Sequence, residues 1–477
     1  MCSSDLALQR DQVTALRERT DAGAAQLNSQ IAASERETAM HELHEDALEF
    51  LFLAPEQLAN EDVLAELAVA APSLLVVDEA HCISEWGHDF RPDYLRLGAA
   101  VEALGRPTVL ALTATAAPPV REEIVERLGL RSPDVIVRGF DRPNIFLAVE
   151  RFFDEAKRDR ALVEHVAAAP KPGIVYTATR RRTEELAAAL EDAGVSAAAY
   201  HAGMTKGERD VVQERFMDDA VDAVVATTAF GMGIDKGNVR FVVHAEPADS
   251  LDSYYQELGR SGRDGKDAEA VLFYRPEDIG LRRFFAGTGQ VDFEQIARVA
   301  EVVAEADEPV EPTEIQEATD LSQSKVVTAV SRLEDAGAVE VLPTGEVAET
   351  DDSPPRADAV QRAAEVEEQR RLFDRSRVDM MRSYAEATSC RRAFLLSYFG
   401  EPYEPPCGRC DVCARGEGDP GEEHMPFAVG SRVRHGQWGE GAVQRYDDGA
   451  VVVLFDEVGY KTLAVDVVVE RDLLQGV

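Results

Sequence analysis

The sequence predicts an α/β protein in which two parallel-sheet lobes stand in tandem and smaller modules follow. Apolar runs such as 73–77 and 108–112 have the length of buried strands, and helical segments rich in Ala, Leu and Glu separate them. A second alternation of strands and helices runs through residues 173–244. Because open parallel sheets bind ligands beyond the carboxyl ends of their strands, we expect a ligand site in the crevice between the lobes.

The composition is that of an ordinary globular protein. The 477 residues are 45% hydrophobic, and the chain is long enough for three or more domains with cores of their own. No stretch approaches the roughly 18 apolar residues of a membrane span, and the N-terminus lacks the pattern of a signal peptide. We therefore expect a cytoplasmic protein without a membrane partner.

The charge is unusual. The chain carries 89 acidic and 50 basic residues, for a formal net charge of −39, and only seven of the basic residues are lysines. Hydrated carboxylates keep a surface soluble where salt screening is strong, so this balance predicts a halophilic protein. A GC-rich genome is the alternative explanation; it accounts for the lysine deficit and leaves the net charge unexplained.

Two adjacent carboxylates end the first of these predicted strands. Asp78 and Glu79 follow the run 73–77 in the arrangement of a Walker B element. The first carboxylate is suited to hold Mg²⁺ through water, and the second to orient or deprotonate the water that attacks the γ-phosphate of ATP. Taken alone, the pair has an alternative interpretation as an acidic loop at a strand end.

The residues after this pair are more specific. The segment 81–94, HCISEWGHDFRPDY, resembles the DEAH box and aromatic-rich loop of RecQ helicases when it follows Asp78 and Glu79. The resemblance implies two RecA-like lobes, the first of them incomplete, and an ATP site that includes His81. In that family the loop senses single-stranded DNA. Aromatic faces suit base stacking and an arginine suits phosphate, and the DNA-binding residues implied in this loop are Trp86, His88, Phe90 and Arg91.

Further segments match the family's helicase motifs in the family's order. They are 112–116 (LTATA), 140–144 (FDRPN), 175–180 (VYTATR), 200–203 (YHAG), 226–236 (ATTAFGMGIDK) and 255–265 (YQELGRSGRDG). The resemblance implies a nucleotide site completed by Gly233, Asp235, Gln256, Arg260 and Arg263. The two arginines are expected to reach the γ-phosphate, at least one of them as an arginine finger, so the expected catalytic residues are Asp78, Glu79, Arg260 and Arg263. DNA contacts are implied for Thr177, Arg180, His201 and Thr227.

Four cysteines form a cluster near the C-terminus. The pattern Cys390-x16-Cys407-x2-Cys410-x2-Cys413 has the spacing of a tetrathiolate zinc site, and segments 390–401 and 407–413 resemble the RecQ zinc subdomain. Four thiolates leave no open coordination position, so the predicted Zn²⁺ is structural. The neighbouring Arg391 and Arg392 are expected to line the DNA path.

The modules stand in an unusual order for the family. We expect lobes at 7–147 and 148–285, a winged-helix-like domain at 286–350, a helical zinc-binding subdomain at 357–415 and a small SH3- or Tudor-like barrel at 426–477, with linkers at 351–356 and 416–425. In the typical member the winged helix follows the zinc region. The presumed recognition helix carries only Lys325 and Arg332 as positive charges, so both duplex binding and a packing role remain open. The barrel is expected to contact a protein partner or DNA.

A phosphate-binding loop of the form G-x-x-x-x-G-K-[ST] does not occur in the 477 residues. A helicase of this class needs one, because backbone amides and a lysine cradle the β- and γ-phosphates. The resemblance begins near residue 7, and residues 1–6 do not fit the family. A GTG start followed by TGC TCT TCC GAT CT, the end of a common sequencing adapter, would encode those residues. We therefore expect a non-native start and a natural gene that extends upstream.

Together these observations predict an ATP-dependent DNA helicase that moves 3′→5′ on single-stranded DNA in repair and recombination. ATP, Mg²⁺ and Zn²⁺ are the implied cofactors, and DNA is the implied partner. Without a phosphate loop the chain is expected to be inactive. The alternative is a non-catalytic DNA-binding or scaffold paralogue that works through the zinc, winged-helix and barrel modules.

Overall fold

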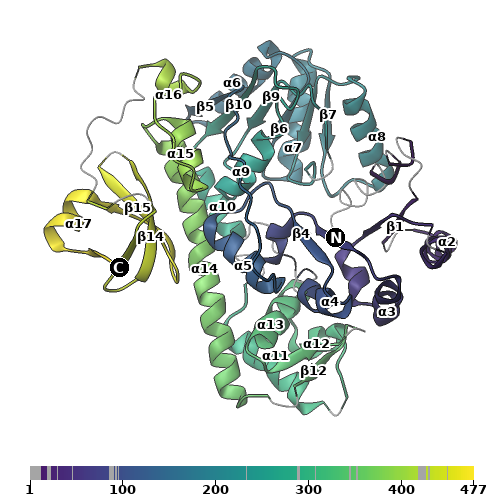
Figure 1. The fold of residues 1–477 in the computed structure, drawn as a ribbon. Helices are drawn as coiled ribbons and strands as arrows, with labels where there is room; N and C mark the ends of the chain where they lie inside the picture. Colours follow the sequence, from purple (N-terminus) through teal and green to yellow (C-terminus); the bar gives the residue numbers. More distant parts are fainter. Residues whose placement is uncertain are drawn as a thin grey trace.

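The computed structural model shows two α/β lobes, with the long helix α14 (Arg356–Glu386) running along one side of them (Figure 1). The structure describes residues 12–14, 16–18, 23–28, 31–45, 47–84, 91, 94, 96–231, 234–286, 290–306, 308–342, 345–350, 353–416, 426–427, 430–447 and 449–477. The predicted tandem α/β architecture is confirmed. No helix in these ranges is both long enough and apolar enough to cross a membrane.

Lobe 1 contains two pairs of parallel strands. β1 (Ala24–Leu27) pairs with β2 (Phe50–Leu53), and β3 (Leu74–Val77) pairs with β4 (Thr108–Ala111). Among the described residues, the two pairs form separate sheets. The helical elements between and after the strands are α2 (Ala33–His44), η1 (Pro55–Ala59), α3 (Glu61–Ala70), η2 (Ala80–Ile83), α4 (Leu97–Ala103) and α5 (Pro118–Arg127).

One face of the β3–β4 pair is covered and the other is open. Leu75 and Val77 of β3 pack into the hydrophobic core of lobe 1. The alternate side chains point the other way and are 43–48% exposed: Leu74, Val76, Leu110 and Leu112. Parallel sheets are normally covered on both faces, so this apolar face is suited to receive a further layer of structure.

Lobe 2 is built on a six-stranded parallel sheet in the order β5-β10-β9-β6-β8-β7. Its strands are β5 (Ile145–Arg151), β6 (Gly173–Tyr176), β7 (Ala197–Tyr200), β8 (Ala223–Ala226), β9 (Phe241–His244) and β10 (Ala268–Tyr274). Its helices are α6 (Glu155–Ala168), α7 (Arg180–Asp192), α8 (Lys206–Met217), α9 (Leu251–Leu258) and α10 (Asp278–Ala286). Every residue of β6, β8 and β9 is buried, as expected for central strands with helices on both faces.

The winged-helix-like domain packs on the first half of α14. It consists of α11 (Phe293–Glu305), α12 (Pro312–Thr319), α13 (Gln323–Asp335) and the antiparallel strands β11 (Val339–Val341) and β12 (Val347–Glu349). Its core includes Ala359, Val360 and Ala363 of α14. Arg332, on the presumed recognition helix α13, is buried and forms a 3.0 Å ion pair with Glu367 of α14. These contacts favour the packing role over duplex binding by α13.

The second half of α14 carries the zinc region and the C-terminal sheet. The helices α15 (Arg391–Tyr398) and α16 (Asp411–Ala414) surround the cysteines. The last module is a five-stranded antiparallel sheet in the order β16-β15-β14-β13-β17. Its elements are β13 (Arg432–His435), β14 (Gly439–Asp447), β15 (Ala450–Phe455), β16 (Gly459–Ala464), α17 (Val465–Arg471) and β17 (Leu474–Gly476).

This C-terminal sheet is docked on the rest of the protein through its outer face. Val452, Leu454 and Tyr460 belong to the same hydrophobic core as lobe 2, α14 and α15. The ring of Tyr460 stacks on Tyr398 at 5.3 Å between centroids, and the Arg445 guanidinium lies 3.3 Å from the ring centre of Phe394. The module is therefore held on lobe 2, α14 and α15 by a substantial apolar contact.

Candidate nucleotide and DNA site

The lobe 1 half of the site lies at the carboxyl end of β3. Asp78 and Glu79 follow the strand directly, and the Asp78 carboxylate accepts a 2.9 Å hydrogen bond from the Glu79 amide. Glu79 adopts a left-handed backbone conformation with φ 48°, which is uncommon for a residue with a side chain. A strained position at a strand end is frequent in functional sites.

His81 joins two of the sequence motifs. Its ring is buried, and Nδ1 lies 3.0 Å from the Thr113 hydroxyl and 3.2 Å from the Glu79 carboxylate. Thr113 follows β4, so the DEAH box and the LTATA segment meet where the two parallel strands end. The His81 ring therefore connects the Glu79 carboxylate directly to the Thr113 hydroxyl.

The base of the aromatic-rich loop is anchored to lobe 1. Ser84 donates a 2.5 Å hydrogen bond to Glu123 of α5, and the Arg91 amide donates to the carbonyl of Cys82 at 3.0 Å. Tyr94 donates to the carbonyl of Asp78 at 3.3 Å. Three of the predicted DNA-binding residues, Trp86, His88 and Phe90, lie outside the described residues.

The DNA-facing residues predicted in lobe 2 follow neighbouring strands of its sheet. Thr177, His201 and Thr227 come directly after β6, β7 and β8, whose carboxyl ends lie side by side. Thr177 and His201 are buried; the Thr177 hydroxyl lies 2.7 Å from that of Thr183, and His201 Nε2 lies 3.1 Å from Glu184. Arg180 is exposed at the start of α7. Arg180 is therefore accessible to solvent, whereas the Thr177 and His201 side chains are held inside lobe 2.

The turn after α9 holds the two candidate arginine fingers. Arg260 is buried, and it interacts with the Tyr176 hydroxyl, which donates to the carbonyl of Phe230 at 2.8 Å. Burial raises the pKa of Tyr176, and the adjacent Arg260 guanidinium acts in the opposite direction. Arg263 is partly exposed and donates to Asp235 at 2.8 Å. Gln256 lies partly buried in α9, and Gly233 lies outside the described residues.

The segment that joins the lobes is hydrogen-bonded to this turn. Arg142 donates to the carbonyls of Gly259 at 2.9 Å and Ser261 at 2.7 Å. Asn144 donates to the carbonyls of Gly262 and Lys266, both at 2.8 Å. The FDRPN motif marks Arg142 and Asn144 in the sequence, but Gly259 and Gly262 lie 117 and 118 residues further along the chain. No role could therefore be predicted for these two side chains from the sequence.

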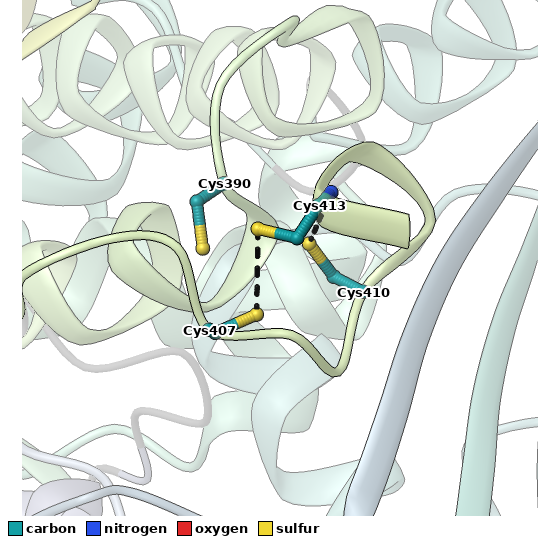
Figure 2. Close-up of side chains that lie close together, drawn as sticks. All are labelled: Cys390, Cys407, Cys410 and Cys413. Atoms are coloured by element: carbon teal, nitrogen blue, oxygen red, sulfur yellow. Dashed lines mark hydrogen bonds between the residues drawn. The ribbon is translucent and has the colours of Figure 1, made fainter. Parts of the chain in front are cut away.

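The four clustered cysteines form a candidate metal site. The sulfur atoms of Cys390, Cys407, Cys410 and Cys413 lie within 4.8 Å of one another and point towards a common centre (Figure 2). The sulfurs of Cys407 and Cys413 are 3.8 Å apart. A tetrahedron with Zn–S bonds of about 2.3 Å has edges of about 3.8 Å, so the cluster fits Zn²⁺ held by four thiolates.

The expectation for the two arginines beside this cluster is wrong. Arg391 and Arg392 are buried and do not line an exposed path. Arg391 binds Asp411 at 3.0 Å, and Arg392 binds Asp141 at 2.8 Å and the carbonyl of Ile145 at 2.7 Å. Both side chains instead fix the zinc subdomain, and Arg392 fixes it to the segment between the lobes.

Three family models match the chain. They are the DEAD/DEAH box helicase model at residues 2–124, the helicase conserved C-terminal domain at 157–265 and the RecQ zinc-binding model at 353–414. Two helicase lobes followed by this zinc module define the class: the protein is a helicase of the DEAD/DEAH type.

The relatives narrow the class. The chain is 34% identical over 410 residues to the probable ATP-dependent DNA helicase RecS of Bacillus subtilis (strain 168), covering 86% of this chain and 79% of that protein. It is 34% identical to the ATP-dependent DNA helicase RecQ of Pasteurella multocida (strain Pm70), covering 86% of this chain and 52% of that protein. The chain belongs to the RecQ family of DNA helicases. It spans about half the length of the RecQ relatives that it matches.

Proposed function

We propose that this protein is the body of an ATP-dependent DNA helicase that moves 3′→5′ along single-stranded DNA in the cytoplasm, in repair and recombination. The observation that carries the proposal is the contact of His81 with both Glu79 and Thr113, which joins the carboxylate pair to the LTATA segment at the carboxyl ends of β3 and β4. In lobe 2, the turn with Arg260 and Arg263 is held by Arg142 and Asn144.

The residues divide the chemistry between the lobes. In this proposal Asp78 would hold Mg²⁺ through water, and Mg²⁺ when bound would neutralise charge on the phosphates of ATP. Glu79 would orient the attacking water and accept its proton. Arg260 and Arg263 supply positive charge to the γ-phosphate from lobe 2. Trp86, His88, Phe90 and Arg91 contact single-stranded DNA together with Arg180 and Thr227, and His81 links that DNA contact to Glu79.

Lobe 1 of the active enzyme carries one further element in this proposal. The 477 residues contain no G-x-x-x-x-G-K-[ST] segment to cradle the phosphates. The open apolar face of β3 and β4 supports the addition of a covering helix there, because parallel sheets are covered on both faces. An ATP-hydrolysing form therefore contains these residues together with a phosphate-binding segment.

A second candidate function is consistent with the lack of a G-x-x-x-x-G-K-[ST] segment in the 477 residues. A chain without a phosphate loop that retains its zinc, winged-helix and barrel modules would act as a DNA-binding or scaffold protein. In that case the C-terminal sheet is the natural site for a protein partner. The acidic surface favours a halophilic setting for either function.

The test is DNA-stimulated ATP hydrolysis, measured at low and at high salt. We expect no turnover above background from the 477 residues alone, and turnover from a form that also carries a G-x-x-x-x-G-K-[ST] segment in lobe 1. If the form with the phosphate-binding segment stays inactive at both salt concentrations, the helicase proposal fails and the scaffold function stands.

A further inference from the structure

The zinc region and the arginine-bearing turn lie on opposite sides of one segment, residues 140–147. This segment joins the two lobes and runs into β5. On one side it is hydrogen-bonded to the zinc loop, residues 407–413. The Leu147 amide donates to the carbonyl of Arg409 at 3.1 Å, and the Arg409 side chain donates to the carbonyl of Asn144 at 3.4 Å. Arg409 stands between two of the cysteines, so its backbone position depends on the cluster.

On the other side, the segment 140–147 is hydrogen-bonded to the turn that carries Arg260 and Arg263. The Asn144 side chain donates to the carbonyls of Gly262 and Lys266, which frame Arg263. Gly262 has φ +57°, and a Cβ at this position would lie 2.4 Å from the Asn144 amide nitrogen. The absence of a side chain at Gly262 therefore allows the Asn144 side chain to approach the backbone of the turn closely.

Arg409 also reaches the far end of the turn directly. Its guanidinium binds the Asp267 carboxylate at 2.5 Å, one residue beyond Lys266. The zinc loop, Asn144 and the turn thus form one continuous polar chain in which each link is a named hydrogen bond. A displacement of the zinc loop would therefore be transmitted through these hydrogen bonds to the turn that carries Arg260 and Arg263.

We propose that Asn144 and Arg409 are positioning residues that transmit the position of the zinc loop to the turn carrying Arg260 and Arg263. The inference rests on the proposed function for the role of those arginines in ATP hydrolysis, but the structural coupling does not. Zinc binding in this protein then sets the geometry of the nucleotide site as well as the stability of its own subdomain.

The coupling is tested in the 477-residue chain by amide hydrogen exchange of residues 260–266. Asn144→Ala and Asn144→Asp are each expected to speed this exchange by about tenfold, since both remove two donated hydrogen bonds and aspartate keeps the shape. Arg409→Ala is expected to speed it by about twofold, because its contact with Asp267 is partly exposed. Zinc content stays at that of the unmodified chain in all three variants.

Asn60→Ala is the matched control, because the Asn60 side chain also makes two hydrogen bonds to the backbone, accepting from the amides of Asp62 and Val63 at the start of α3 in lobe 1. It should leave residues 260–266 unchanged. The proposal is wrong if Asn144→Asp exchanges like the unmodified chain, which would make Asn144 a packing residue, or if Arg409→Ala leaves the turn unchanged.

A kinetic measurement separates positioning from a purely structural role. In the ATP-hydrolysing form, the two Asn144 variants are expected to lower kcat about tenfold and to leave KM for ATP within about twofold, as for an interaction made only in the transition state. A rise in KM with an unchanged kcat contradicts the proposal. If that form hydrolyses no ATP, the proposed function fails, while the exchange experiment still decides the coupling.

Discussion

Replacing Cys410 with serine is expected to abolish zinc binding and to lower the melting temperature of the C-terminal half of the protein by about 10 °C or more. The Cys410 sulfur is fully buried and accepts a 3.4 Å hydrogen bond from the Cys413 amide. Cys410 and Val412 belong to the hydrophobic core shared by lobe 2, α14 and the C-terminal sheet. Loss of the metal therefore loosens contacts well beyond the zinc loop.

Zinc content by elemental analysis and thermal unfolding by calorimetry check this expectation. We expect one zinc ion per unmodified chain and less than a tenth of that in Cys410→Ser. Cys82→Ser is the control, because Cys82 is also buried but lies in lobe 1 outside the cluster. A Cys410→Ser protein that keeps its zinc, or that melts at the unmodified temperature, would show that the four cysteines do not form a structural metal site.

Replacing Arg260 or Arg263 with alanine is expected to lower kcat for ATP hydrolysis by about 10³-fold for at least one of the two, in the ATP-hydrolysing form. Both residues lie in the lobe 2 turn that Arg142 and Asn144 bind from the segment between the lobes. Arg263 is partly exposed beside Asp235, and Arg260 is buried near Tyr176. Lysine at the critical position is expected to rescue little, since it lacks the planar fork of donors.

The matched control is Arg283→Ala, which removes another lobe 2 arginine from an ion pair, here with Asp379 at 2.6 Å. It should leave kcat within about twofold of the unmodified value. Single-turnover hydrolysis with saturating DNA separates the chemical step from product release. The arginine-finger assignment is refuted if both Arg260→Ala and Arg263→Ala keep kcat within tenfold of the unmodified enzyme.

The strand ends of the site were the most predictable part of the structure. Asp78 and Glu79 follow an apolar run, and Thr113 follows another, so parallel pairing of those runs brings the residues together. The zinc cluster was predictable for a similar reason, because three of its cysteines lie within one short loop. In both cases a pattern of neighbouring residues in the sequence determines how the side chains of the site are arranged.

The partners of buried charges could not be predicted, because they are remote in the sequence. Arg392 meets Asp141, which is 251 residues away, and nothing local distinguishes Arg392 from a surface arginine. Its burial overturned the expected place on the DNA path. The same holds for Arg332 on α13, whose partner Glu367 lies on a helix expected to serve the zinc region.

The docking of the C-terminal sheet had a signal in the sequence. The strand β15 is continuously apolar, AVVVLF, where a strand with one solvent face would alternate. Val451, Val453 and Phe455 fill the inside of the module, while Val452 and Leu454 pack outward on the helicase body. A continuous apolar strand in a small antiparallel module indicates that both of its faces are covered.

The most direct measurement of the central claim is strand separation on DNA duplexes that carry a single-stranded tail at one end. We expect the form with a phosphate-binding segment to unwind a 3′-tailed duplex with ATP and to leave a 5′-tailed duplex paired. The 477-residue chain should bind the tail and unwind neither. ATP-dependent unwinding of the 5′-tailed duplex alone, or of neither duplex by the extended form, would contradict the account.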